Sequence, residues 1–109
     1  MAGMVALSRI PVVAGIAYIE RVRRLPASFS ATLAVEPDNR YFRHAIAVLA
    51  DGEKVGYVAP EVAAGIYDSV KQAPQPLACQ ARKSKPSDHA TSGVEILLDF
   101  SGLQLPATP

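Results

Sequence analysis

Residues 36–48 read EPDNRYFRHAIAV, and this segment changes from a polar turn into an apolar strand. Pro37 fixes its own φ and biases Glu36 toward an extended backbone, so we expect an incoming strand to end near Glu36. Asp38 and Asn39 then offer side-chain oxygens that can cap a turn, and asparagine tolerates left-handed dihedral angles. The chain is therefore expected to reverse direction here between two strands.

Rings and cations gather directly after this turn, at Arg40, Tyr41, Phe42, Arg43 and His44. Such a combination can form a small face for a phosphate and a base. The alternative interpretation is a connecting loop with a core tyrosine and solvated charges.

Alternating and apolar runs on both sides of this segment predict strands. Residues 28–35 alternate, with Phe29, Ala31, Leu33 and Val35 on one face. Residues 45–49 are apolar and predict the next strand, and Asp51-Gly52 predicts a tight hairpin turn into a return strand at 53–58. Further strands are expected at 77–81 and 94–98, with a loop at 82–93.

The apolar run at 10–19 is too short to span a bilayer, and no cleavage site of a signal peptide follows it. We expect a central strand at 12–19 with a bulge or bend at Gly15, followed by one basic helical turn at 20–25. Pro60 and Glu61 predict the start of a helix, in which Val62, Ile66 and Val70 form one apolar stripe.

Length and composition indicate one globular domain. The chain has 109 residues, half of them apolar, a net charge of +1 and a single cysteine, Cys79. We predict a mostly β fold, a small OB-like or SH3-like antiparallel barrel of about six strands with one main α-helix. It would occupy residues 10–103, between a lead-in at 1–9 and a flexible tail at 104–109.

Five segments in this order resemble the HIRAN domain, a small module of some DNA-repair helicases that also occurs as stand-alone bacterial proteins. The matching segments, which cover roughly residues 12–66, are Val13–Tyr18, Glu36–Tyr41, Ala45–Val48, Lys54–Val58 and Pro60–Ala63. The resemblance implies an OB-like or SH3-like barrel that binds DNA, in some members at single-stranded ends.

Transferred by position, the binding face would include Tyr18, Asn39, Tyr41 and Tyr57, with the backbone around Arg40 and Phe42. Arg43 and His44 complete the set of candidate nucleic-acid-binding residues. The family often has an acid where Phe42 stands and an asparagine where His44 stands. A phenyl ring cannot accept a hydrogen bond from a sugar hydroxyl, so end-specific recognition is the property that this departure changes.

Two further basic clusters are either solvated surface or additional contacts to nucleic acid. They are Arg21, Arg23 and Arg24, and separately Arg82, Lys83 and Lys85.

Catalysis finds little support in the sequence. Cys79 lies in an apolar strand, where a thiol is normally inert, and Ser87, Asp88 and His89 are adjacent only in sequence. There is no glycine-rich phosphate loop, and one cysteine cannot make a zinc site. We therefore expect no enzyme activity, no cofactor and no metal.

The sequence thus predicts a non-catalytic module that grips single-stranded DNA or DNA ends in repair or processing, with a helicase or nuclease as a candidate partner protein. The alternative is a protein-interaction module that docks a peptide on exposed barrel tyrosines. A fragment of a catalytic subunit is the third and weakest interpretation. No contact with a membrane is expected, and the absence of a targeting segment predicts a cytoplasmic protein.

Overall fold

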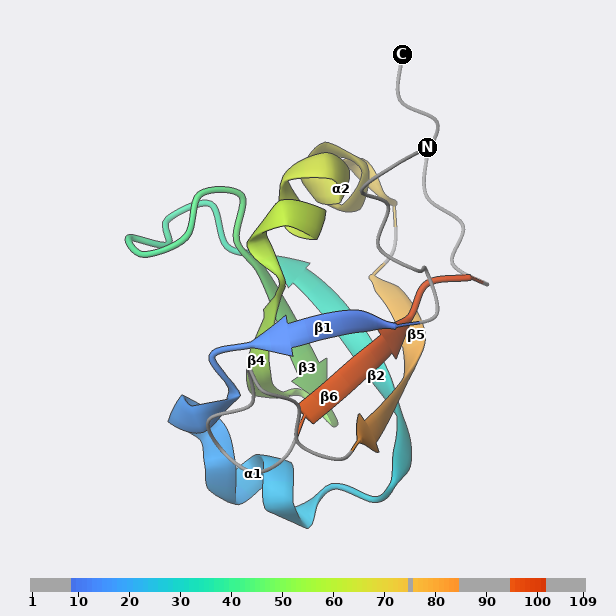
Figure 1. Ribbon diagram of the computed structural model, residues 1–109. Coiled ribbons are helices and arrows are strands. Elements are labelled where there is room, and N and C mark those ends of the chain that lie inside the picture. The colour runs from blue at the N-terminus through green and yellow to red at the C-terminus, as the bar shows by residue number, and fades with distance from the viewer. Residues whose placement is uncertain (1–8, 75, 85–94, 102–109) are drawn as a thin grey trace.

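The computed structural model describes residues 9–74, 76–84 and 95–101 of the chain (Figure 1). In chain order, its elements are β1 (Ile10–Val13), a 3-10 helix η1 (Gly15–Tyr18), α1 (Ile19–Arg24), β2 (Ser28–Val35), β3 (Ile46–Ala50), β4 (Glu53–Val58), α2 (Pro60–Gln72), β5 (Leu77–Ser84) and β6 (Glu95–Asp99). The predicted tail at 104–109, and the lead-in apart from Arg9, lie outside the described residues.

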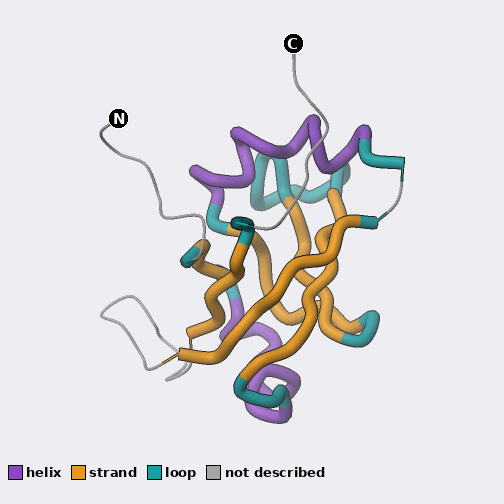
Figure 2. The backbone as a smooth tube through the Cα atoms, turned by 90° about the vertical axis from the view of Figure 1, so that its right-hand side faces the viewer, coloured by secondary structure: helices purple, strands orange, loops and turns teal. Residues whose placement is uncertain are grey.

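Six antiparallel strands close into a barrel in the order β1–β4–β3–β2–β5–β6, and β6 pairs with β1. This confirms the predicted small antiparallel barrel with one main helix. Closure leaves no open sheet edge among the described strands, so backbone donors and acceptors along them find partners in neighbouring strands. Helices α1 and α2 lie at opposite ends of the barrel, as Figures 1 and 2 both show.

Strand β2 and the hairpin after β3 form as their sequences predict. Ala31 and Leu33 point into the core, with Phe29 and Val35 packed against it. Asp51 and Gly52 both have positive φ, 51° and 80°. Those are the backbone angles that a two-residue hairpin of the I′ type requires.

The predicted strand at 12–19 is wrong beyond Val13. Ala14 has a left-handed φ of 63°, and the Ala17 amide donates to the Ala14 carbonyl at 3.2 Å, which starts η1. A short apolar run has the same composition in a buried strand and in a helical turn, so periodicity could not separate the two. The basic helical turn predicted at 20–25 is confirmed as α1.

Three strands also differ from the prediction in their bounds. Strands β3 and β6 are each shifted by one residue, and β5 continues to Ser84, so Arg82 and Lys83 belong to a strand and not to a loop. The remainder of that predicted loop, from 85 to 93, lies outside the described residues. Cys79 is buried in β5, as predicted.

Helix α2 starts at Pro60 as predicted and covers one end of the barrel. Its buried apolar side chains are Ala63, Tyr67 and Val70, whereas Val62 and Ile66 are half-buried at the edge of the core. The predicted stripe is therefore rotated on the helix, and its centre includes Tyr67, which the four-residue spacing did not identify.

Candidate nucleic-acid interface

The loop between β2 and β3 is held in shape by Asn39. The Glu36 amide donates to the Ala45 carbonyl at 2.8 Å, which closes the base of the loop. Inside it, the Oδ1 atom of Asn39 accepts hydrogen bonds from the amides of Tyr41 and Phe42, at 2.7 and 2.8 Å. The capping role predicted for this turn is therefore confirmed for Asn39, and it fixes the backbone that carries both rings.

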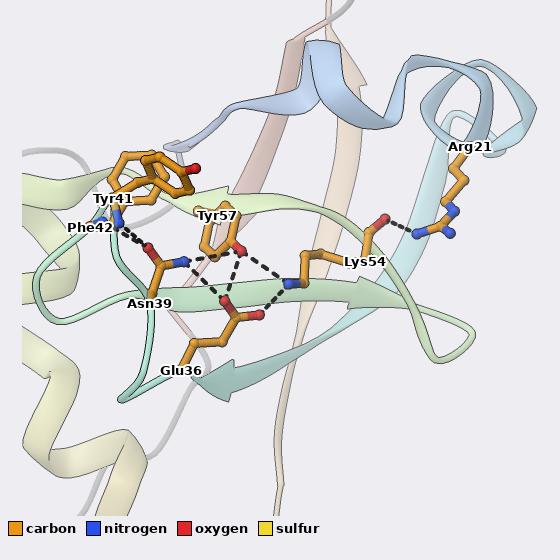
Figure 3. A network of polar contacts seen from close by, with 7 residues as sticks. All are labelled: Arg21, Glu36, Asn39, Tyr41, Phe42, Lys54 and Tyr57. Atoms are coloured by element: carbon orange, nitrogen blue, oxygen red, sulfur yellow. Dashed lines mark hydrogen bonds and ion pairs between the residues drawn. The ribbon is translucent and has the colours of Figure 1, made fainter.

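A compact polar network lies beneath this loop (Figure 3). The Tyr57 hydroxyl donates to Oε1 of Glu36 at 2.7 Å, and Lys54 forms an ion pair with the other oxygen of that carboxylate. Lys54 Nζ also donates to the Tyr57 hydroxyl at 3.0 Å. The Nδ2 atom of Asn39 donates to Oε1 of Glu36 at 3.0 Å and to the Tyr57 hydroxyl at 3.2 Å. The network thus ties the loop to β4.

The charges of this network stabilise one another. Burial on its own raises the pKa of Glu36, but hydrogen bonds from Lys54, Tyr57 and Asn39 and the charge of Lys54 outweigh it and lower that pKa. The hydrogen bonds to Glu36 and Tyr57 raise the pKa of Lys54. Burial raises the pKa of Tyr57. Glu36 is therefore ionised, Lys54 protonated and Tyr57 neutral around pH 7.

A β-bulge brings Lys54 and Tyr57 to the same side of β4. Val48 pairs with Gly56 and Leu49 pairs with Lys54, so Val55 is the extra residue. An inserted residue shifts the alternation of side chains by one position. Val55 and Val58 therefore both point into the main core of the barrel, and Lys54 and Tyr57 both lie on the other face of the sheet, outside the barrel. Tyr57 there joins a second apolar cluster with Ala45 and Ala47.

A pocket of about 620 Å³ opens over this second cluster. It is lined by Ala14, Ala17, Tyr18, Asp38, Asn39, Arg40, Tyr41, Phe42 and Tyr57. The Phe42 ring lies 5.1 Å from the Tyr57 ring at an interplanar angle of 41°, and both belong to the buried side of the pocket. Tyr41 is 90% exposed, and it is the one large hydrophobic side chain that is exposed among the described residues.

The structure brings six of the predicted site residues together in this pocket: Tyr18, Asn39, Arg40, Tyr41, Phe42 and Tyr57. Arg43 and His44 do not line it, although both are exposed in the same loop. The His44 ring instead lies 5.2 Å from the Tyr67 ring of α2, edge to face. His44 therefore joins the loop to the helix.

Sequence reasoning missed the ion pair of Glu36 and Lys54, and it missed Ala14 and Ala17 on the pocket wall. The ion pair depends on the bulge in β4, which no pattern of residues in the sequence predicts. The two alanines depend on the turn into η1, within the segment that was predicted as a strand. Arg21 was predicted only as part of a basic cluster, yet its guanidinium lies over the Tyr18 ring, 5.7 Å from the ring centre.

The pocket suits a planar group that stacks on rings, with cations at its rim. Its lining contains no cysteine, serine, threonine or histidine that could serve as a nucleophile with its base. Within the described part of the chain, no three His, Cys, Asp or Glu side chains gather closely enough to hold a metal ion. Across the same residues, no helix is long and apolar enough to cross a membrane.

Comparison with known proteins adds one match. The family model described as HIRAN domain matches residues 11–88, which include strands β2–β5, all of β1 except Ile10, and every residue of the pocket lining. The comparisons with curated proteins and with solved structures found no match.

Proposed function

The chain belongs to the HIRAN domain family, a family of DNA-binding modules, and from this premise we propose that it grips single-stranded DNA or frayed DNA ends in the pocket beside Tyr41. The module binds and does not itself catalyse. A role in DNA repair or processing, a helicase or nuclease partner and a cytoplasmic location are parts of the same proposal, carried over from the sequence.

The exposure of Tyr41 is the observation that carries the proposal. A tyrosine that serves the core would be buried, but this ring is 90% exposed at the mouth of a pocket lined by further rings. The backbone beneath it is fixed by Asn39, so little conformational freedom of the loop remains to be lost on binding. An exposed ring on a backbone fixed in this way can serve as a stacking platform for a base.

The other residues of the site have different proposed roles, which depend on where they lie in the pocket. Tyr18 and Phe42 offer further ring surface, while Tyr57 is 8% exposed and forms part of the floor. Arg40 is exposed at the rim, where a guanidinium can contact phosphate. The side-chain amide of Asn39 already makes four hydrogen bonds within the protein, so it positions the rings and does not read a base edge.

Docking of a peptide remains the second candidate function, because the same pocket is lined largely by rings and alanine side chains. Such a groove would hold an apolar or aromatic peptide side chain where we place a base. Salt dependence separates the two ligands, since phosphate contacts release counterions and apolar contacts do not.

The direct test is a titration of labelled single-stranded, duplex and overhang DNA with the wild type, Tyr41→Ala and Tyr41→Phe. We expect Tyr41→Ala to lose about 1–3 kcal/mol of binding free energy on single strands, the usual contribution of one stacked base. Tyr41→Phe keeps the ring and should bind nearly as well as the wild type. Thermal melting of all three proteins should agree closely, because the ring is outside the core.

Two results would refute the proposal. One is equal single-strand affinity for the wild type and Tyr41→Ala. The other is absence of DNA binding at low salt, which would favour the peptide.

A further inference from the structure

A second cationic surface lies next to the pocket, on helix α1. This helix follows directly on Tyr18, the last residue of η1, and its last turn carries Arg21, Arg23 and Arg24, all exposed. Tyr18 lines the pocket. The arginine-bearing helix therefore starts at the wall of the pocket.

Lys83 joins this group from the far end of β5. Its Nζ donates to the carbonyl of Leu25 at 2.9 Å and to that of Arg23 at 3.3 Å, so its charge lies at the C-terminal end of α1. The Lys83 amide also donates to the carbonyl of Ala27 at 2.9 Å. Two basic segments that are separate in the sequence thus meet at one end of the barrel. We call Arg21, Arg23, Arg24 and Lys83 the α1 shelf.

Arg21 connects the α1 shelf to the pocket. Its guanidinium lies over the Tyr18 ring, and its Nη1 donates to the carbonyl of Lys54 at 3.0 Å, next to the network beneath the loop (Figure 3). The arginine is held in place by these contacts. Arg21 therefore links the pocket wall to the cationic residues of α1.

The acids beside the shelf do not cancel its charge. Glu53 lies 3.8 Å from Arg21 and Glu20 lies 4.0 Å from Arg23, with all four side chains well exposed. Exposed pairs of this kind are worth at most about 1 kcal/mol, so a phosphate can replace the carboxylate. Arg24 has no acidic partner among the residues that the structure describes.

We propose that the α1 shelf binds the phosphodiester backbone of the same DNA strand as it leaves the pocket, which makes the module a reader of several nucleotides. This inference rests on the proposed function of the pocket. Six helical residues span roughly 9 Å, a length that suits about two phosphates of an extended single strand. Together with about three bases on the rings of the pocket, the strand would fill a site of about five nucleotides, near the lower end of the range for OB-like folds.

The test compares two oligothymidylates, a trimer and an octamer, with Arg24→Gln and a matched control, Lys71→Gln. Each variant removes one positive charge from an exposed side chain in the last turn of a helix, α1 or α2, at opposite ends of the barrel. NMR titration measures the trimer into the millimolar range, and fluorescence anisotropy measures the octamer. The double variant Arg23→Gln/Arg24→Gln enlarges the effect.

We expect Arg24→Gln to weaken the octamer several-fold and leave the trimer unchanged, while Lys71→Gln changes neither. The slope of log K against log salt for the octamer should fall by roughly 0.7 for each phosphate that the variant no longer neutralises, or about 1.4 in the double variant. An equal loss of affinity for both lengths, no loss for the octamer, or the same loss in Lys71→Gln would overturn the α1 shelf.

Failure of the shelf and failure of the pocket give different results. If Tyr41→Ala weakens the binding of both oligonucleotides and Arg24→Gln weakens the binding of neither, the pocket is the binding site and the α1 shelf is not part of it. If Tyr41→Ala weakens neither, the pocket itself is not the binding site.

Discussion

His44 illustrates how one residue can serve the backbone more than the ligand. Its φ is 56°, in the left-handed region, where histidine and asparagine are both tolerated better than most residues. The resemblance to HIRAN domains places an asparagine at this position. Both residue types can adopt the left-handed backbone that the turn into β3 needs. The change from asparagine to histidine therefore leaves that turn intact.

Lys54 provides a residue-scale prediction about pH. Replacement by methionine removes the cation from Glu36 and Tyr57, and we expect a loss of about 1–2 kcal/mol at neutral pH, reduced by the partial exposure of the pair. The folded-state pKa of Glu36 is lowered, so its contribution is present above its ordinary pKa of 4.5 and is lost as the pH falls. The pKa of Lys54 is raised, so its contribution persists up to its ordinary pKa of 10.5 and is lost above it.

The difference in unfolding free energy between wild type and Lys54→Met should therefore be greatest from about pH 5 to pH 10 and should shrink below about pH 4.5. Urea denaturation at a series of pH values measures it. A difference that grows on acidification would contradict the role assigned to this ion pair.

Phe42 supports a prediction about DNA ends. Its ring packs on Tyr57 and has no acceptor, so we expect the wild type to prefer a free 3′-hydroxyl end over a 3′-phosphate end by less than tenfold, about 1.4 kcal/mol. Phe42→Asp should increase the preference, because a carboxylate accepts from the hydroxyl and repels the phosphate. Phe42→Asn, which is uncharged, should increase it less. Competition between the two ends of one oligonucleotide gives the ratio, and tenfold discrimination by the wild type would show this account of Phe42 to be wrong.

At the scale of elements, the sequence predicted those structural features that depend only on residues close together in the chain. Strand β2 shows a clean alternation, the Asp51-Gly52 turn needs positive φ at two positions, and Pro60 marks the first residue of α2. Each of these features follows from local backbone preference or from a period of two. The turn at Asn39 is of the same kind, since its side chain bonds amides two and three residues further on.

What the sequence could not predict depends on contacts between distant residues. The bulge that turns Lys54 and Tyr57 outward exists only in the pairing of β3 with β4. The left-handed backbone at Ala14 ends the strand and starts η1 in place of the predicted longer strand. This turn brings Tyr18 to the pocket. The hydrogen bond from Lys83 to Arg23 of α1 joins residues 60 positions apart. The resemblance supplied the site residues, but their division into lining, floor and support required the fold.

Helix α2 gives a prediction at this scale. Val70 is 8% exposed and packs in the main core, so Val70→Asp should cost about 3 kcal/mol or more by burying an unpaired charge. Ile66→Asp should cost less, because Ile66 is only half-buried. Ala64→Asp, on the exposed face of the same helix, is the control and should cost at most about 0.7 kcal/mol of helix propensity. Thermal melting ranks the three variants, and an equal cost for Val70→Asp and Ala64→Asp would contradict the packing of this helix.

At the scale of the whole molecule, a net charge of +1 cannot attract DNA by bulk electrostatics. Binding must then depend on cations placed on one part of the surface, at the loop after β2 and at the α1 shelf. The α1 shelf lies at the opposite end of the barrel from α2, whose exposed residues include Glu61, Asp68 and Lys71. A near-neutral chain can therefore still present a cationic surface to one strand, with a salt dependence set by a few local contacts.

This placement predicts how DNA should change the stability of the whole chain. Single-stranded DNA at a hundred times its Kd should stabilise the fold by about 2.7 kcal/mol, which corresponds to a rise in Tm of roughly 10 °C for a domain of this size. Because about three or four phosphate contacts imply a salt slope of roughly −2 to −3, most of that rise should disappear at 500 mM salt. Tyr41→Ala, measured at the same DNA concentration, should show a smaller rise at low salt and the same Tm without DNA. Thermal melting at 50 and 500 mM salt tests all three statements. A rise in Tm that an apolar peptide produces equally at both salt concentrations, with none from DNA at 50 mM, would assign the pocket to a peptide instead.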